Sequence, residues 1–135
     1  MRLKKPRKEK GKLKTKDTSR DINYDMERPR FALQHLQSGY CVQDCNRDEK
    51  AALADRMRIL SQLTWQELRN EPRHGLGYEK ISTDSLNVAI PPALKDDVSF
   101  IAFRFKGMAP MVGYKENSTF FIVWLDRVFT VYDHG

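Results

Sequence analysis

A chain of 135 residues with 40% hydrophobic side chains has room for one compact domain with a single core. Its formal net charge is +6, but the first twenty residues hold ten Lys and Arg against two acidic residues, so the other 115 residues carry 14 basic and 16 acidic side chains. The composition therefore excludes a strongly basic body, and any attraction to a polyanion belongs to the N-terminal end.

Cysteine usage and apolar runs limit the other classes of protein. Two cysteines and three histidines are few for a four-ligand zinc site, and no cofactor signature is present, so we expect neither a metal nor a cofactor. A disulfide between Cys41 and Cys45 would enclose three residues and add little stability, so we expect reduced thiols and a cytoplasmic location. No run approaches the roughly 18 apolar residues of a membrane span or resembles a signal peptide.

Residues 1–22 contain almost no apolar side chains apart from Leu3 and Leu13, so we expect a basic arm that is disordered when free. Such an arm would neutralise phosphates of RNA with salt-dependent affinity that does not depend on base sequence. It would equally serve as a solubilising tail or order against a partner, since no aromatic side chain is present to stack on bases. Residues 23–135 are expected to form the single domain.

Two helix starts follow residues 31–36, for which the pattern is compatible with a short edge strand or with a helical turn. Asn46 and Glu49 form a capping-box pattern for a helix that runs to about residue 62, and Thr64 and Glu67 repeat it for a helix to about residue 70. Apolar side chains recur in the first helix at helical spacing, which predicts a face packed on a sheet. Pro72 prevents extension of the second helix.

The segment of residues 73–81 is a candidate binding loop. Gly75 and Gly77 permit close approach of a ligand to the backbone. The titratable groups that the segment brings to this loop are His74, Tyr78 and Lys80. The third glycine of a dinucleotide-binding fingerprint is absent. The alternative interpretation is a flexible connection between helix and sheet. A short edge strand is expected at residues 86–90, before two prolines.

Four hydrophobic runs in the last third of the chain, residues 98–105, 111–114, 119–125 and 128–132, predict an antiparallel meander. In the third run, alternation places Trp124 with Ile122 on one face and Leu125 with Val123 on the other, so this strand is expected to be interior. The fold class is therefore α+β, with two helices packed on one face of a four- to five-stranded, mainly antiparallel sheet.

The second face of this sheet needs a cover of tails, loops or a partner, because two helices cover only one face. Alternatively, it forms a concave surface on which cationic and phenolic side chains gather. The candidates for that surface are Arg104, Lys106, Tyr114, Lys115, Tyr132 and His134.

The element order and three strings of residues resemble the RelE/ParE-type toxins of bacterial toxin–antitoxin modules, small proteins of the microbial-ribonuclease-like fold. The strings are Phe103-Arg104-Phe105, Val112-Gly113-Tyr114 and the closing stretch from Phe121 to Tyr132, and the resemblance covers about residues 28–133. It implies metal-free cleavage of RNA, with the ribosome and a cognate antitoxin-like protein as partners.

The resemblance also implies roles for individual residues. Arg104 would stabilise the pentavalent phosphorane, while Tyr132 and His134 would transfer protons. Lys106 and Lys115 would hold flanking phosphates. The further candidates for RNA contact are Tyr114, Lys80 and His74.

A second hypothesis is a non-catalytic interaction module that docks a protein through its exposed sheet face or its basic arm. In the toxins an arginine tends to precede the glycine and a histidine tends to follow the aspartate. This chain has Val112 and Phe129 at those places, and its body is mildly acidic. Both observations favour the second hypothesis.

Overall fold

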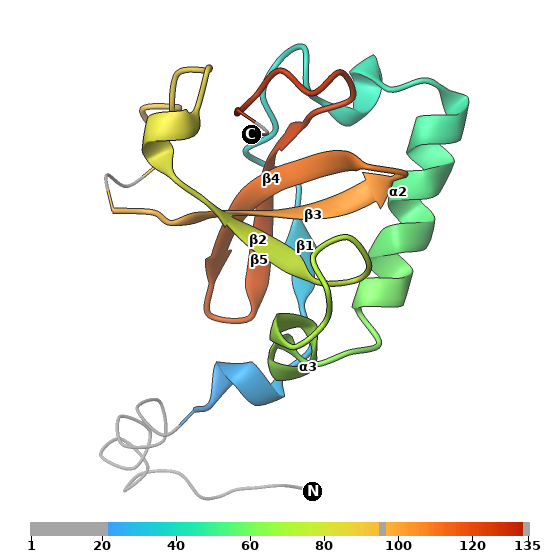
Figure 1. Cartoon of the computed structure of the whole chain (residues 1–135), viewed down its shortest axis with the longest axis vertical. Helices are drawn as coiled ribbons and strands as arrows, with labels where there is room; N and C mark the ends of the chain where they lie inside the picture. The colour runs from blue at the N-terminus through green and yellow to red at the C-terminus, as the bar shows by residue number, and fades with distance from the viewer. Residues whose placement is uncertain (1–21, 95–96, 134–135) are drawn as a thin grey trace, which may run out of the picture.

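The computed structural model describes residues 22–94 and 97–133, so the predicted arm of residues 1–22 lies outside the described residues except for Ile22. The described chain has an α+β fold with two α-helices and one five-stranded sheet (Figure 1). Its main elements are β1 (Arg30–Ala32), α2 (Arg47–Leu60), α3 (Trp65–Arg69), β2 (Tyr78–Ile81), β3 (Phe100–Lys106), β4 (Ala109–Glu116) and β5 (Thr119–Leu125).

The strand order across the sheet is β1-β5-β4-β3-β2. Three of the four strand pairs are antiparallel, whereas β1 runs parallel to β5, so the sheet is mixed. The α+β class and the mostly antiparallel sheet are thus confirmed. β5 lies between β1 and β4, in agreement with its apolar pattern on both faces.

Both predicted capping boxes are formed. The backbone N–H of Glu49 donates to Asn46 Oδ1 and that of Asn46 donates to Glu49 Oε1, each at 2.8 Å. Thr64 and Glu67 repeat the arrangement at the start of α3. These side chains satisfy backbone donors that have no partner within the helix, which fixes where each helix begins.

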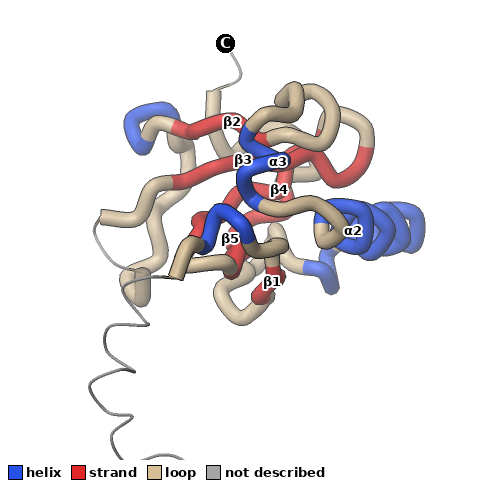
Figure 2. Tube along the Cα trace, turned by 90° about the horizontal axis from the view of Figure 1, so that it is seen from below, coloured by secondary structure: helices blue, strands red, loops and turns tan. Residues whose placement is uncertain are grey.

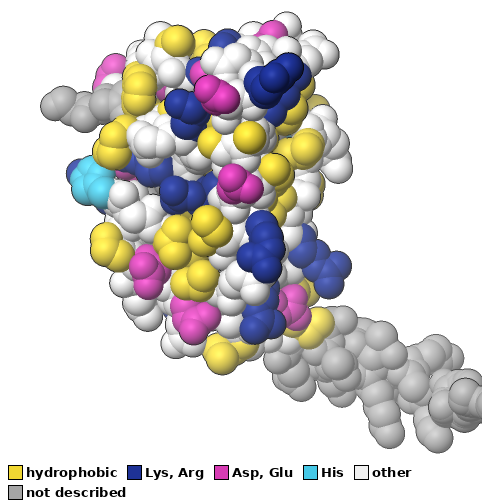
Figure 3. Space-filling model, turned by 90° about the vertical axis from the view of Figure 1, so that its right-hand side faces the viewer, with side chains coloured by type: hydrophobic (Ala, Val, Ile, Leu, Met, Phe, Trp, Pro, Cys, Tyr) yellow, Lys and Arg dark blue, Asp and Glu magenta, His cyan; other side chains and the backbone are white. Residues whose placement is uncertain are grey.

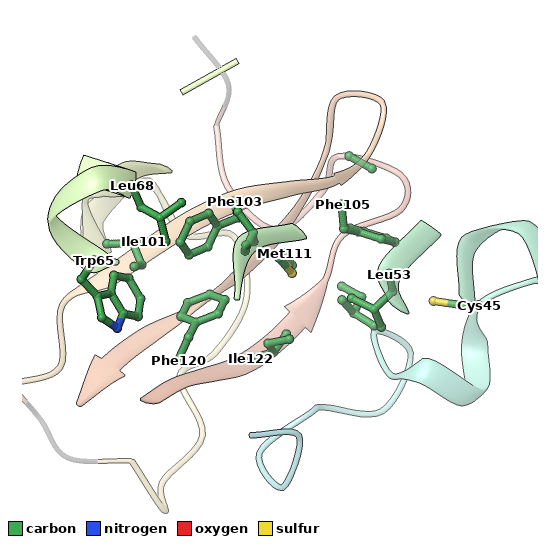
Figure 4. Close-up of a cluster of buried hydrophobic side chains, with 13 residues drawn as sticks. Cys45, Leu53, Trp65, Leu68, Ile101, Phe103, Phe105, Met111, Phe120 and Ile122 are labelled. Carbon is green, nitrogen blue, oxygen red and sulfur yellow. The ribbon is translucent and has the colours of Figure 1, made fainter. Parts of the chain in front are cut away.

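The first face of the sheet is covered by both helices. Leu53 and Leu60 of α2, with Trp65 and Leu68 of α3, pack on strand side chains in one cluster. Figure 4 shows this cluster between the helices and the strands, and Figure 2 shows α2 along one side of the sheet with α3 in front of it. The strand members are Ile101, Phe103, Phe105, Met111, Phe120, Ile122 and Leu125.

The second face is covered over most of its area by the chain itself. Phe100, Val112 and Trp124 on this face pack against Leu94 and Val131 from two irregular segments. One segment follows β2 and the other, residues 126–133, follows β5. They join where Asn87 N donates to the Val131 carbonyl at 2.7 Å and where Leu86 bridges to Tyr132.

The predicted strands at residues 86–90 and 128–132 are wrong, because only the isolated bridge between Leu86 and Tyr132 is present there. The Asp126 carboxylate, fully buried, accepts the backbone N–H groups of Thr130 and Val131 at 2.8 and 2.9 Å. A side chain thus takes the donors that a strand ladder would need, and residue 129 adopts a positive φ of 63°.

The predicted alternation along β5 holds up to Val123 and is wrong for the last two residues of the strand. Val112 pairs with Trp124 but Gly113 pairs with Ile122, so Val123 is an extra residue in a β-bulge. Val123 and Trp124 therefore both lie in the cluster on the second face, while Leu125 joins the helix-covered cluster.

Candidate functional site

Arg104, the predicted phosphate-stabilising residue, is 6% exposed and forms an ion pair with the partly buried Glu79. Its Nη2 donates to Glu79 Oε1 at 2.9 Å, and its Nη1 donates to the Tyr132 hydroxyl at 3.3 Å. The structure therefore brings together two of the three predicted catalytic residues. It also adds the carboxylate of Glu79 from β2, which sequence reasoning missed.

The environment of this pair favours a structural role over phosphate binding. Glu79 neutralises the guanidinium, Tyr132 contacts it, and Arg104 is 6% exposed, so among the described residues a phosphodiester finds little of this cation to contact. Burial raises the pKa of Tyr132 by disfavouring the phenolate, although the Arg104 hydrogen bond opposes this effect. A phenol with a raised pKa is protonated at neutral pH and is a poor proton donor there.

The other predicted site residues do not join Arg104. Lys115 places its ammonium 5.2 Å from the ring centroid of Trp65, on the helix-covered face. Lys106 and Lys80 are exposed at β3 and β2, and His74 is exposed in the loop before β2. His134 lies outside the described residues.

The glycine pair of the candidate binding loop serves the turn itself. The N–H groups of Gly75 and Gly77 both donate to the Pro72 carbonyl at 2.9 Å. A Cβ at Gly77 would lie only 2.9 Å from that oxygen, so the chain needs a glycine there. This geometry favours the connection over a ligand-binding loop.

The described residues form no continuous basic surface on the face that contains α2. Figure 3, which looks at the molecule from the side of α2, shows Lys and Arg interspersed with Asp and Glu around a group of hydrophobic side chains. Several cations on the described chain are paired, as Arg69 is with Asp25 at 3.1 Å and Arg127 with Glu49 at 3.8 Å. Such a mixed surface offers little attraction to the RNA backbone.

An aromatic cleft remains open at the other end of the second face. It has a volume of about 500 Å³, and the rings of His35, Tyr114 and Phe121 line it. Tyr114 and Phe121 are stacked with centroids 5.1 Å apart and an interplanar angle of 13°. The His35 ring lies 5.5 Å from that of Phe121 and 6.2 Å from that of Tyr114.

Two turns set the positions of these rings. The β4–β5 turn, with Asn117 at φ 58°, fixes a register in which Tyr114 pairs directly with Phe121. After β1, Leu36 N donates to the Leu33 carbonyl at 3.2 Å, and this turn carries His35 to the two rings. Tyr114 lies four residues along the sheet from Arg104, at the position opposite Phe100, or about 13 Å away.

The charges around the aromatic cleft are mainly negative. Asp97 and Glu116 contribute to its wall, whereas the ammonium of Lys115, the one cationic residue among the described lining residues, lies over Trp65. Burial, followed by the charge of Glu116, raises the pKa of Tyr114. Aromatic faces beside carboxylates attract cations and repel phosphates.

Sequence reasoning identified Tyr114 and Lys115 and missed the other residues of the aromatic cleft. Counting back from a two-residue turn at Asn117 and Ser118 would have paired Tyr114 with Phe121. No local pattern points to His35 or Asp97, because they come from irregular segments whose positions depend on the whole fold.

Within the described residues, no group of three His, Cys, Asp or Glu side chains is placed to hold a metal ion. Nor does that part of the chain include a helix of the length and apolarity needed to cross a membrane. No protein-family model matches the sequence, no curated protein matches it, and no solved structure matches the fold.

Proposed function

We propose that the domain is a non-catalytic protein-interaction module that binds its partner in the aromatic cleft. One observation carries this proposal: the second face is buried under the chain itself around Arg104, yet aromatic rings line an open cleft of about 500 Å³ at its other end. Concave sites with aromatic walls and a few polar groups are typical of ligand recognition. We propose this open end of the second face as the exposed sheet face of the module.

The chemistry of the aromatic cleft supports an arginine side chain of the partner as its ligand. A guanidinium stacks on aromatic faces such as those of His35 and Phe121, and it is weakly hydrated compared with an ammonium. The carboxylate of Asp97 would pair with its positive charge, and Glu116 adds negative charge to the wall of the cleft. An anionic ligand would instead approach two charges of its own sign.

The test is isothermal titration calorimetry of the full chain with a short Gly/Ser peptide that contains one arginine. We expect the arginine peptide to bind about tenfold more tightly than the same peptide with citrulline, since the charge is removed and the shape kept. Phe121→Leu and Glu116→Gln should each weaken binding severalfold, and the exposed His74→Leu should leave it unchanged. The proposal would be overturned if the citrulline peptide bound as tightly as the arginine peptide. It would also be overturned if neither Phe121→Leu nor Glu116→Gln weakened binding.

A second candidate function is RNA binding of the RelE/ParE toxin type. It is supported by the net charge of +8 in the first twenty residues and by the order of one strand, two helices and an antiparallel set of strands. The ribosome and an antitoxin-like protein would then be partners. The test is binding of a single-stranded RNA at low salt, with RNA integrity followed by gel electrophoresis. Binding that depends on the arm and not on the domain would assign the interaction to phosphate neutralisation alone.

A further inference from the structure

We propose that the chain's own N-terminal arm, through Arg7, occupies the aromatic cleft until a protein partner displaces it. This inference rests on the proposed function, because it assigns an internal competitor to the same site. It would make binding of a partner dependent on release of residues 1–21.

Charge complementarity is the first argument. Residues 1–21 contain ten Lys and Arg against three acidic residues, whereas the described residues contain 13 basic and 14 acidic side chains. The aromatic cleft presents Asp97 and Glu116 at its wall, and the ammonium of Lys115 is directed to the other face. The most basic segment of the chain and an aromatic site with carboxylates thus belong to one molecule.

The place where the arm joins the fold is the second argument. Arg30 N donates to the Ser118 carbonyl at 3.1 Å, so the first described residues lie beside the β4–β5 turn. Glu116 of the aromatic cleft is two residues from Ser118. Figure 1 shows these first residues at the lower end of the sheet, below that turn, and residues 126–133 at the upper end.

Chain length excludes Arg20 among the three arginines of the arm, and the neighbouring lysines favour Arg7 over Arg2. The segment Tyr24–Met26 packs on α3, where Asp25 pairs with Arg69, so the arm must pass from the helix-covered face to the second face. Arg20 is two residues from Ile22 and has too little chain for this path, whereas the fifteen residues from Arg7 to Ile22 span up to about 50 Å. Lys5 and Lys8 flank Arg7, which strengthens its attraction to the carboxylates.

Tethering compensates for a weak intrinsic interaction. Attachment to the domain through a linker of this length gives an effective concentration in the mM range, so an arm with a mM dissociation constant would fill the aromatic cleft about half the time. A partner then binds only the unoccupied fraction, which lowers its apparent affinity by the same factor.

The test compares ¹H–¹⁵N NMR spectra of the full native chain, Arg7→Gln and the matched control Arg20→Gln. In Arg7→Gln we expect the amide signals of His35, Tyr114 and Phe121 to move toward the positions that they have in the native chain at 0.5 M NaCl. In Arg20→Gln the same signals should keep their native positions. The arginine peptide should also bind Arg7→Gln two- to threefold more tightly than the native chain.

Cleft signals and peptide affinities that are identical in all three chains would overturn the arm proposal and leave the proposed function standing. An effect of Arg2→Gln in place of Arg7→Gln would overturn the assignment to Arg7. If the arginine peptide binds none of the chains, the proposed function fails. A shift of the cleft signals in Arg7→Gln would even then report the arm in the aromatic cleft.

Discussion

Arg104 shows why residue type and strand position do not by themselves identify a catalytic group. Its place on a strand, opposite apolar neighbours, predicts an available cation on the sheet face. In the structure Arg104 pairs with Glu79 of β2, which lies 25 residues earlier in the sequence. Because the partner lies on another strand, only the pairing of β2 with β3 reveals that the charge is neutralised and buried.

The ion pair predicts a large effect of Glu79→Gln on stability. Removal of the carboxylate leaves a cation that is 6% exposed without its opposite charge, and we expect the free energy of unfolding to fall by about 3 kcal/mol. Asp25→Asn removes the exposed pair with Arg69 and should cost less than about 1 kcal/mol. Urea unfolding measures both. If both variants lowered the free energy of unfolding equally, the Arg104–Glu79 pair would contribute no more to stability than an exposed ion pair.

Two buried tyrosines and one half-buried tyrosine predict loss of stability at alkaline pH. Burial is the main cause of the raised pKa values of Tyr78, Tyr114 and Tyr132. Because each folded pKa exceeds the unfolded value of about 10, the stabilisation is fully present below pH 10 and is lost as pH rises through the folded values. Urea unfolding between pH 8 and pH 11 should show a shallower decline for Tyr132→Phe than for the native chain. An identical decline would contradict a raised pKa for Tyr132.

At the scale of elements, the sequence predicts regular structure where local chemistry decides it. The capping boxes and Pro72 bound the two helices, and β3, β4 and β5 coincide with apolar runs. The last run fails because a buried aspartate takes the N–H groups of Thr130 and Val131, a contact that no periodicity reveals. The alternation predicted along β5 fails after Val123, because alternation assumes a strand ladder without a β-bulge.

The bulge predicts that Gly113 cannot be replaced without loss of stability. A Cβ at this position would lie 2.9 Å from the carbonyl carbon of Phe121, closer than neighbouring backbone tolerates. We expect Gly113→Ala to lower the free energy of unfolding by about 2 to 3 kcal/mol, as overpacking of a core does. The matched variant Gly75→Ala places its methyl group 3.6 Å from the nearest atom, Pro72 O, and should change stability little. Similar midpoints for the two variants in urea would contradict this packing at Gly113.

At the scale of the whole molecule, function follows from which parts of the second sheet face the chain leaves open. The sequence indicates that this face requires a cover and leaves open whether the chain or a partner supplies it. In the structure the chain itself covers Arg104, which is 6% exposed and donates to the Tyr132 hydroxyl. Tyr114 and Phe121, in contrast, line an open cleft. The covered Arg104 and the open Tyr114 lie about 13 Å apart on one face of the sheet, so no local sequence pattern distinguishes the covered part from the open part.

The most direct test of the proposed binding surface is an NMR map of the arginine peptide on the full chain. With ¹⁵N- and ¹³C-labelled protein, we predict that the largest shift changes fall on His35, Tyr114, Phe121 and the neighbouring carboxylates Asp97 and Glu116. Signals of Arg104 and of residues 126–133 should stay in place. Changes centred on Arg104, on the exposed Val128 and Phe129, or spread over α2 would contradict a binding site in the aromatic cleft.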